Sequence, residues 1–422
     1  MTGQHKNALF VRTKNAPLSS AMRNYGNFWE GIRMTSRERL LNVFNGNTPD
    51  RTPITLFITD TDIEDGPPDC VIGKRTDDTI GDLIRFHEIL GLDIMLRIST
   101  NVFEPIAFDC DSKDWTNVWE FSEDKKYLTH KIITPEGELR EVFNVEGEDF
   151  HGDPSEDWMK LRNVRTESLI KALEDLRIVK KYRPEIPAYD FSDIGIVEKR
   201  LGGRGIVLPR VPSSVFNSAF GLRKLEDLLV DPIVNPVFYK ELMELCTDDV
   251  IGVGKKIAEA GGDVMRVVGN VAHGGMVSSK FYLEHIFPYE KRYVDALTSD
   301  GCKVLFHNCG QCAGLLEVYR TMLDGEALES FATPPSGGDI TSLKNAREVL
   351  GDGVVMVGNF DQVHLLKEGT KEEIRREVEK IFEETRGDNR FIFSTSDSII
   401  PGTPKENIEA LAEFALECSN KN

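Results

Sequence analysis

The sequence predicts a (β/α)8 TIM barrel with an N-terminal extension and an inserted antiparallel hairpin. Three observations predict it: eight short apolar runs, a plausible helix between most neighbouring runs, and polar residues directly after the runs end. In such a barrel the chemistry lies at the carboxyl ends of the strands, so the polar residues there are candidates for a functional site. A doubly wound open sheet is the alternative.

The first third of the chain contains two predicted barrel strands and the insertion. The first helix is expected to follow Thr35, which forms a capping box with Glu38. Strands are predicted at 53–58 and 92–98. Residues 115–147 alternate apolar with charged residues around a turn signal, which is typical of an antiparallel hairpin. We therefore expect an extension over 1–33, a barrel over 34–420, and an insertion of about 110–200 within the barrel.

The alternation of strands and helices resumes after the insertion. Further strands are predicted at 205–211, 263–268, 304–306, 327–332, 353–358 and 390–394. Thr370 and Glu373 form a capping box before the last strand. Thr403 and Glu406 give the same signal for the last helix, which completes eight strand–helix units.

Composition excludes several classes of function. The 422 residues carry 70 acidic and 51 basic side chains, and a net charge of -19 argues against binding to nucleic acid. No run approaches the roughly 18 apolar residues of a membrane span, so we expect no membrane partner. The seven cysteines are odd in number and mostly scattered. This usage suits a reducing compartment, and we expect a cytoplasmic location.

The segment 301–312 carries the strongest chemical signal. His307 and Cys309 are two residues apart at a strand end and can face the same side, because alternate residues of a strand do so. An imidazole and a thiolate together suit zinc, which needs a third protein ligand and an open position if it is catalytic. Cys312 could supply that ligand, as could a residue from the last strand end. The alternatives without metal are buried thiols used as apolar filler and a redox dithiol formed by Cys309 and Cys312.

Several short motifs occur in an order that resembles a known family. They are Arg37 to Leu40 with Asp50 to Pro53, Ala260 to Asp263, Ser278 to Pro288, His307 to Gly310, Gly338-Asp339, Gly358 to Asp361 and Pro401 to Pro404. Over roughly residues 34–418 the chain resembles the uroporphyrinogen decarboxylase superfamily, and within it the corrinoid-dependent (cobalamin) methyltransferase branch. The resemblance implies a (β/α)8 barrel.

The resemblance also implies a zinc site made from a His-x-Cys pair and a distant cysteine just before a Pro-Gly-Thr-Pro-like turn. His307 and Cys309 match the pair, and the place of the distant cysteine falls at or beside Asp397. The expected metal ligands are therefore His307, Cys309 and Asp397. An oxygen ligand in place of a second thiolate would make the metal more Lewis-acidic.

The expected function is a zinc-dependent methyltransferase. It would move a methyl group from a small methylated donor to the cob(I)alamin of a separate corrinoid protein, and the expected donor is a methyl ether that undergoes O-demethylation. Three alternatives stay open: transfer from a methylcorrinoid to a thiol or other acceptor, a uroporphyrinogen-type decarboxylase, and a non-catalytic binding subunit of a methyltransferase complex. Assembly as a homo-oligomer is also left open.

Polar residues after the predicted strands would line the substrate pocket of such an enzyme. Catalytic roles are assigned to His273, Asp60 and Asn359, with His273 as the general acid or base. Substrate-binding roles are assigned to Asp62, Asn101 and Arg210, and Arg210 would pair with a carboxylate or phenolate.

Overall fold

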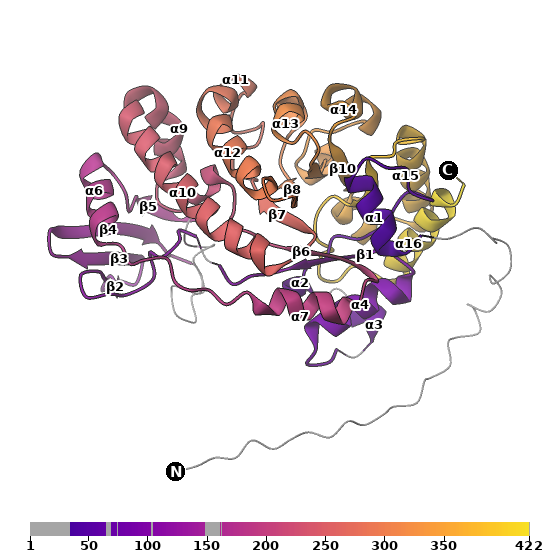
Figure 1. Cartoon of the computed structure of the whole chain (residues 1–422), viewed down its shortest axis with the longest axis horizontal. Helices are drawn as coiled ribbons and strands as arrows, with labels where there is room; N and C mark the ends of the chain where they lie inside the picture. Colours follow the sequence, from indigo (N-terminus) through magenta and orange to yellow (C-terminus); the bar gives the residue numbers. More distant parts are fainter. Residues whose placement is uncertain are drawn as a thin grey trace, which may run out of the picture. The chain divides into compact units, whose positions relative to one another are not determined.

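The computed structural model describes residues 34–421 except 65–68, 74, 103, 148–160 and 162. Its parallel strands form a barrel with helices outside it (Figure 1), which confirms the predicted fold class. The barrel strands are β1 (Ile94–Ile98), β6 (Gly205–Pro209), β7 (Val264–Val268), β8 (Lys303–Asn308), β9 (Ala327–Ser330), β10 (Val355–Phe360) and β11 (Phe391–Thr395). They pair in the order β1-β6 and β11-β10-β9-β8-β7, and a parallel bridge between Arg210 and Arg266 joins the two groups.

Residues 53–59 occupy the eighth place, between β1 and β11, but they do not form the regular strand predicted at 53–58. They pair in parallel at Ile54 with Phe393 and at Thr59 with Arg97. Between these bridges the Phe57 N–H donates to the hydroxyl of Thr395 at 3.0 Å. Because a side chain replaces a carbonyl as the acceptor, the ladder is interrupted there. The segment still closes the barrel.

The helices cover the outside of the barrel and one of its ends. They are α1 (Ser36–Phe44), α2 (Asp60–Glu64), α3 (Asp69–Ile72), α4 (Thr79–Leu90), α6 (Leu173–Tyr182), α7 (Ser192–Leu201), α8 (Val215–Phe220), α9 (Leu225–Val234), α10 (Pro236–Ala260), α11 (Ser279–Phe281), α12 (Phe287–Thr298), α13 (Leu316–Met322), α14 (Leu343–Leu350), α15 (Lys371–Glu384) and α16 (Lys405–Ser419). Within the described ranges, none of them has both the length and the apolar composition that crossing a membrane requires.

The predicted helix starts can be checked against the observed caps. The capping boxes of Thr35 with Glu38 and of Thr370 with Glu373 are both present. The cap predicted for the last helix is wrong, because α16 follows Pro404 without a side-chain cap. The Thr403 hydroxyl instead donates to the carbonyl of Ile400 at 2.7 Å.

The insertion is an antiparallel sheet in the order β2-β3-β4-β5. Its strands are β2 (Thr116–Phe121), β3 (Tyr127–Thr134), β4 (Gly137–Asn144) and β5 (Arg165–Glu167). Figure 1 shows β2, β3 and β4 beside α6 and apart from the barrel strands. Arg165 connects this sheet to the end of α8 by donating to the carbonyls of Phe220 and Gly221 at 2.8 and 2.6 Å. The predicted extension over 1–33 lies outside the described residues, and the insertion limits near 110 and 200 stay predictions.

The inside of the barrel has an apolar half and a polar half. Alternate residues of the strands pack with Leu40, Val43 and Phe44 of α1; they are Met95, Ile206, Leu208, Val264, Leu305, Ala327, Val355, Val357 and Ile392. Residues two positions further along a strand face the same side. Those positions hold Arg97, Arg210, Arg266, His307, Glu329, Asn359 and Ser394. The polar half therefore lies at the carboxyl ends of the strands, where the sequence predicts the site.

Candidate metal centre

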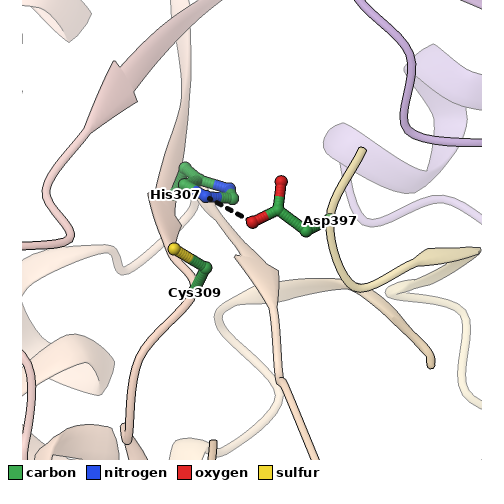
Figure 2. A group of neighbouring side chains, drawn as sticks. All are labelled: His307, Cys309 and Asp397. Carbon is green, nitrogen blue, oxygen red and sulfur yellow. Dashed lines mark ion pairs between the residues drawn. The ribbon is translucent and has the colours of Figure 1, made fainter. Parts of the chain in front are cut away.

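Three of the predicted residues converge at the carboxyl end of the barrel (Figure 2). His307 is on β8, Cys309 follows β8, and Asp397 follows β11. One ligand atom from each side chain can be chosen so that all lie within 4.8 Å of one another. The distance from His307 Nε2 to Asp397 Oδ2 is 3.9 Å. Cys312, the alternative third ligand, is buried and is not part of this group among the described residues.

Glu329 orients the imidazole of His307. The two residues are direct neighbours in the β8–β9 register, and Glu329 Oε2 lies 3.2 Å from His307 Nδ1. With Nδ1 bonded to the carboxylate, Nε2 faces Asp397. A metal-binding histidine commonly uses its second nitrogen in this way, because the hydrogen bond fixes the tautomer and the orientation of the ring.

Two buried arginines hold Glu329 in turn. Arg97 Nε lies 3.0 Å from Glu329 Oε1, and Arg266 Nε lies 3.3 Å from Glu329 Oε2. The ring of Phe57 lies 4.5 and 4.7 Å from the guanidinium carbons of Arg97 and Arg266. The same ring packs edge-on against His307 at 5.3 Å. The imidazole therefore rests on a charged layer whose members are each hydrogen-bonded or stacked.

These neighbours set the charges at the site. Burial lowers the pKa of His307, but hydrogen bonds with Cys309 and Glu329 and the charge of Asp397 outweigh it and raise the pKa to about 9. Burial by itself raises the pKa of Glu329, yet Arg97, His307 and Arg266 hold this pKa well below its usual range. Without a metal the imidazole is thus a cation between two carboxylates.

The loop that carries Asp397 is fixed by Asp62. The Ser398 hydroxyl donates to Asp62 Oδ2 at 2.9 Å, and Asp62 also accepts from the Thr59 N–H at 2.8 Å. Asp62 therefore connects helix α2, which follows residues 53–59, to the loop after β11. Asp60 accepts from the N–H and hydroxyl of Ser99 at 2.8 and 2.9 Å, which holds the loop after β1. Burial raises the pKa of Asp60, and these hydrogen bonds oppose the rise.

The loop after β7 lies against Cys309 and Gly310. Asn270 Nδ2 is 3.8 Å from Cys309 Sγ. A Cβ on Gly310 would lie 2.5 Å from His273 Cγ, so the two loops can approach this closely only if residue 310 is glycine. Burial lowers the pKa of His273, against the charge of Asp339. The structure thus places His273 beside the residue that follows Cys309.

The other predicted residues lie farther along the same rim. Asn359 Nδ2 donates to the Phe331 carbonyl at 3.3 Å, and its Oδ1 is buried without a partner in the described structure. Arg210 is half-buried and donates to the Ser213 hydroxyl at 3.3 Å. Asn101 is exposed, with a φ of 55°. Within the described ranges, Asn101, Arg210 and Asn359 form no hydrogen bond or ion pair with the three candidate ligand residues. Their roles stay predictions.

Sequence reasoning missed the charged layer below His307. Arg97 and Arg266 each lie inside an otherwise apolar strand, Glu329 lies in the short strand β9 before Ser330, and all three are buried. A charged residue in the middle of a buried strand requires a buried partner. Three such residues in three strands of one barrel were the available signal for this network.

The chemistry of the donor set fits a zinc ion. Imidazole nitrogen, thiolate sulfur and carboxylate oxygen are its three usual protein ligands, and a three-ligand site leaves a position for substrate. His307 is additionally oriented through its other nitrogen. The residues that would hold the metal are His307, Cys309 and Asp397.

Zinc binding is expected to strengthen as the pH rises toward about 9. The imidazole must release its proton before Nε2 can bind a metal, and the raised pKa keeps that proton bound at neutral pH. Below this pKa, each unit of pH lowers the apparent affinity about tenfold through this proton alone. Chelator competition measured across the neutral to alkaline range checks the slope. An affinity independent of pH would contradict a ligand role for His307.

Comparison with known proteins places the chain in a family. Residues 164–418 match the profile described as uroporphyrinogen decarboxylase (URO-D). A uroporphyrinogen decarboxylase of Syntrophotalea carbinolica is 32% identical over 187 residues, which cover 44% of this chain and 49% of that protein. The methylcobamide:CoM methyltransferase MtbA of Methanosarcina mazei is 25% identical over 256 residues, covering 58% of this chain and 69% of MtbA. The first of these matches thus spans about half the length of the relative.

A solved structure of a methyltransferase from Methanosarcina mazei has the same fold. The TM-score is 0.59 at 17% sequence identity, and the superposition covers 91% of this chain and 99% of the other. This likeness supports the barrel independently of the sequence matches. Because the URO-D profile covers more than half of the chain, the chain belongs to the uroporphyrinogen decarboxylase (URO-D) family.

Proposed function

We propose that this protein is a zinc-dependent methyltransferase that works with a corrinoid carried by a separate protein. The observation that carries the proposal is the convergence of His307, Cys309 and Asp397 at the carboxyl end of the barrel. Some relatives are named methyltransferases, among them MtbA and a methylated-thiol–coenzyme M methyltransferase of Methanosarcina mazei, and others are named uroporphyrinogen decarboxylases, so the choice of methyl transfer rests on the candidate ligand set. A cytoplasmic location, expected from the cysteines, is part of the same proposal.

The composition of the ligand set supports a direction for the transfer. A carboxylate gives less electron density to a metal than a thiolate does. Zinc bound by one thiolate, one imidazole and one carboxylate would therefore be a stronger Lewis acid toward a substrate oxygen than zinc bound by two thiolates and one imidazole. We therefore propose a methyl ether as donor. Its carbon–oxygen bond breaks, the electron pair stays on oxygen, and a carbon–cobalt bond forms with the electron pair of cob(I)alamin. One proton then converts the released oxygen into a hydroxyl.

The chain's own residues have separate tasks in this reaction. Glu329 keeps Nε2 of His307 directed at the site, and Asp62 holds the loop of Asp397. His273, beside the loop of Cys309, is the proposed general acid or base at the leaving oxygen. The proposed substrate contacts are Asp62, Asn101 and Arg210, and Asp60 and Asn359 keep their proposed catalytic roles.

Transfer from a methylcorrinoid to a thiol is the second candidate. The names of MtbA and of the methylated-thiol relative favour it, because each includes methyl transfer involving coenzyme M. In that direction the zinc would lower the pKa of the acceptor thiol. The decarboxylase alternative has less support from the site, since Arg97 and Arg266 are both paired with Glu329 and are not free to bind a polycarboxylate.

Metal analysis and a substrate screen on the purified full chain test the proposal. We expect one zinc per chain and methylation of free cob(I)alamin by at least one methyl ether. Methylamines are screened in parallel, methylcobalamin with small thiols tests the second candidate, and carbon dioxide release from uroporphyrinogen tests decarboxylation. A chain that binds no zinc and transfers no methyl group in either direction would contradict the proposal and leave a binding subunit as the alternative.

A further inference from the structure

Two hydrogen-bonded asparagines, Asn270 and Asn217, lie next to the sulfur of Cys309. Asn270, in the loop after β7, places its Nδ2 3.8 Å from Cys309 Sγ. Its Oδ1 accepts a hydrogen bond from Nδ2 of Asn217 at 3.0 Å. Asn217 is on α8 and is 2% exposed. The two amides therefore form a relay from a buried helix to the thiol of the metal centre.

The backbone determines which way both amides point. Asn217 Nδ2 donates to the Val268 carbonyl at 3.2 Å, and Asn217 Oδ1 accepts from the Val271 N–H at 3.2 Å. A carbonyl can only accept and an N–H can only donate, so Asn217 cannot be turned over. The atom of Asn270 that faces the Asn217 amide nitrogen must then be oxygen. The amide nitrogen of Asn270 is consequently the atom directed at sulfur.

The helix that carries Asn217 is itself anchored. Both carboxylate oxygens of Glu290 accept from the first N–H groups of α8, Val215 at 3.1 Å and Phe216 at 3.0 Å. Ser214 caps the same helix by accepting from the Asn217 N–H at 3.3 Å. The relay thus begins at a buried, fully bonded helix start and ends at a half-buried sulfur.

We infer that Asn270 is a positioning residue that donates an N–H to the metal-bound thiolate of Cys309 and reduces the charge that the sulfur gives to the metal. The inference rests on the proposed function, because it requires a metal at His307, Cys309 and Asp397. A hydrogen bond to a thiolate stabilises its lone pairs, so the metal receives less electron density and becomes more Lewis-acidic. The hydrogen bond from Asn270 and the carboxylate ligand Asp397 would both raise the Lewis acidity of the metal, and both favour a methyl donor that is activated through oxygen.

Cobalt(II) substitution provides a readout other than activity. The sulfur-to-cobalt charge-transfer band reports the energy of the sulfur lone pairs, and the loss of a hydrogen bond raises that energy. We expect the band of Asn270→Asp to move to longer wavelength, because an oxygen replaces the donor while the acceptor for Asn217 is kept. Asn270→Ala should move the band in the same direction by less, since it adds no negative charge. Asn270→Ala also provides the test on its own if Asn270→Asp does not fold.

Affinity and a matched control complete the experiment. Loss of an outer contact to a metal ligand typically costs about 10–100-fold in metal affinity or activity, and we expect a change of that size in Asn270→Ala. The control is Asn389→Asp, the same chemical change at an exposed residue on the opposite end of the strands. Its charge-transfer band should equal that of the wild type.

The outcomes separate this inference from the proposed function. If the wild type binds cobalt and transfers methyl groups but both Asn270 variants keep its charge-transfer band, the inference is overturned and the proposed function stands. A shift of equal size in Asn389→Asp would also overturn it. If the wild type binds neither zinc nor cobalt, the inference and the proposed function both fail.

Discussion

Replacement of His307 by alanine is expected to remove the bound zinc and to lower methyl transfer about a thousandfold. His307 supplies the one imidazole of the candidate centre, and the two remaining ligands, Cys309 and Asp397, come from loops beyond β8 and β11. A metal contributes several kcal/mol of charge stabilisation in the transition state, and about 4 kcal/mol corresponds to a thousandfold in rate. Zinc content and the initial rate of cob(I)alamin methylation measure the two effects.

The matched control for this substitution is His364→Ala. The His364 side chain is 46% exposed, follows β10, and directs its ring nitrogens at Glu368 and the carbonyl of Pro335. This variant should keep its zinc and its rate. Thermal unfolding of both variants shows whether the fold is retained. If His307→Ala keeps stoichiometric zinc and full activity, the metal centre has been assigned to the wrong residues.

Replacement of Glu329 by glutamine is expected to lower the free energy of unfolding by about 3–5 kcal/mol, the usual cost of removing one partner from a buried ion pair. Glu329 is fully buried and neutralises Arg97 and Arg266, which are 1% and 7% exposed. Glutamine keeps the shape of the side chain but leaves both guanidinium groups without the carboxylate that pairs with them. Urea denaturation measures the loss, and zinc affinity should fall as well because His307 loses the group that orients it.

The pH dependence of this loss follows from the depressed pKa of Glu329. A carboxylate with a lowered pKa stabilises the fold above the pKa of the unfolded chain, about 4.3 for glutamate. The contribution is lost as the pH falls through the lower pKa of the folded state. The difference in the free energy of unfolding between the wild type and Glu329→Gln should therefore reach its full size at neutral pH and decrease in acid.

Glu326→Gln is the matched control, at the start of the same strand region as Glu329. Glu326 is also buried, and burial raises its pKa to about 7. It accepts from the Val304 N–H, which the amide oxygen of glutamine can also do, and its ion pair with Lys303 spans 3.8 Å. We expect a much smaller loss of stability. Equal losses in the two variants would mean that the charge of Glu329 is not what stabilises the barrel.

Local patterns in the sequence were sufficient for most of the fold and for two of the three candidate ligand residues. His307 and Cys309 could be recognised because strand geometry alone places residues two apart on one side. The capping boxes at Thr35 and Thr370 depend on three-residue spacing, and both are present. The irregular pairing of 53–59 could not be predicted, because it depends on the Thr395 hydroxyl more than 300 positions away.

The surroundings of the site depend on contacts between distant segments. Asp397 was suggested by family resemblance, since nothing local marks it as a ligand. Its positioning by Asp62 through Ser398 joins residues 336 positions apart. Glu329 was missed because its partners, Arg97 and Arg266, belong to other strands, β1 and β7, which are distant in the sequence. Periodicity identifies which face of a strand is buried, but not which charges meet there.

The apolar half of the barrel interior, filled by α1 and the inward side chains of the strands, limits the order in which reactants can bind. A barrel filled at its amino-terminal end gives every reactant the same entrance. On the proposed function, the methyl donor and the far larger corrinoid protein must share that opening. The donor therefore has to enter before the partner docks, and the demethylated product leaves only after the partner has departed. Turnover would then follow a compulsory order, and excess corrinoid protein would inhibit it by docking before the methyl donor has entered.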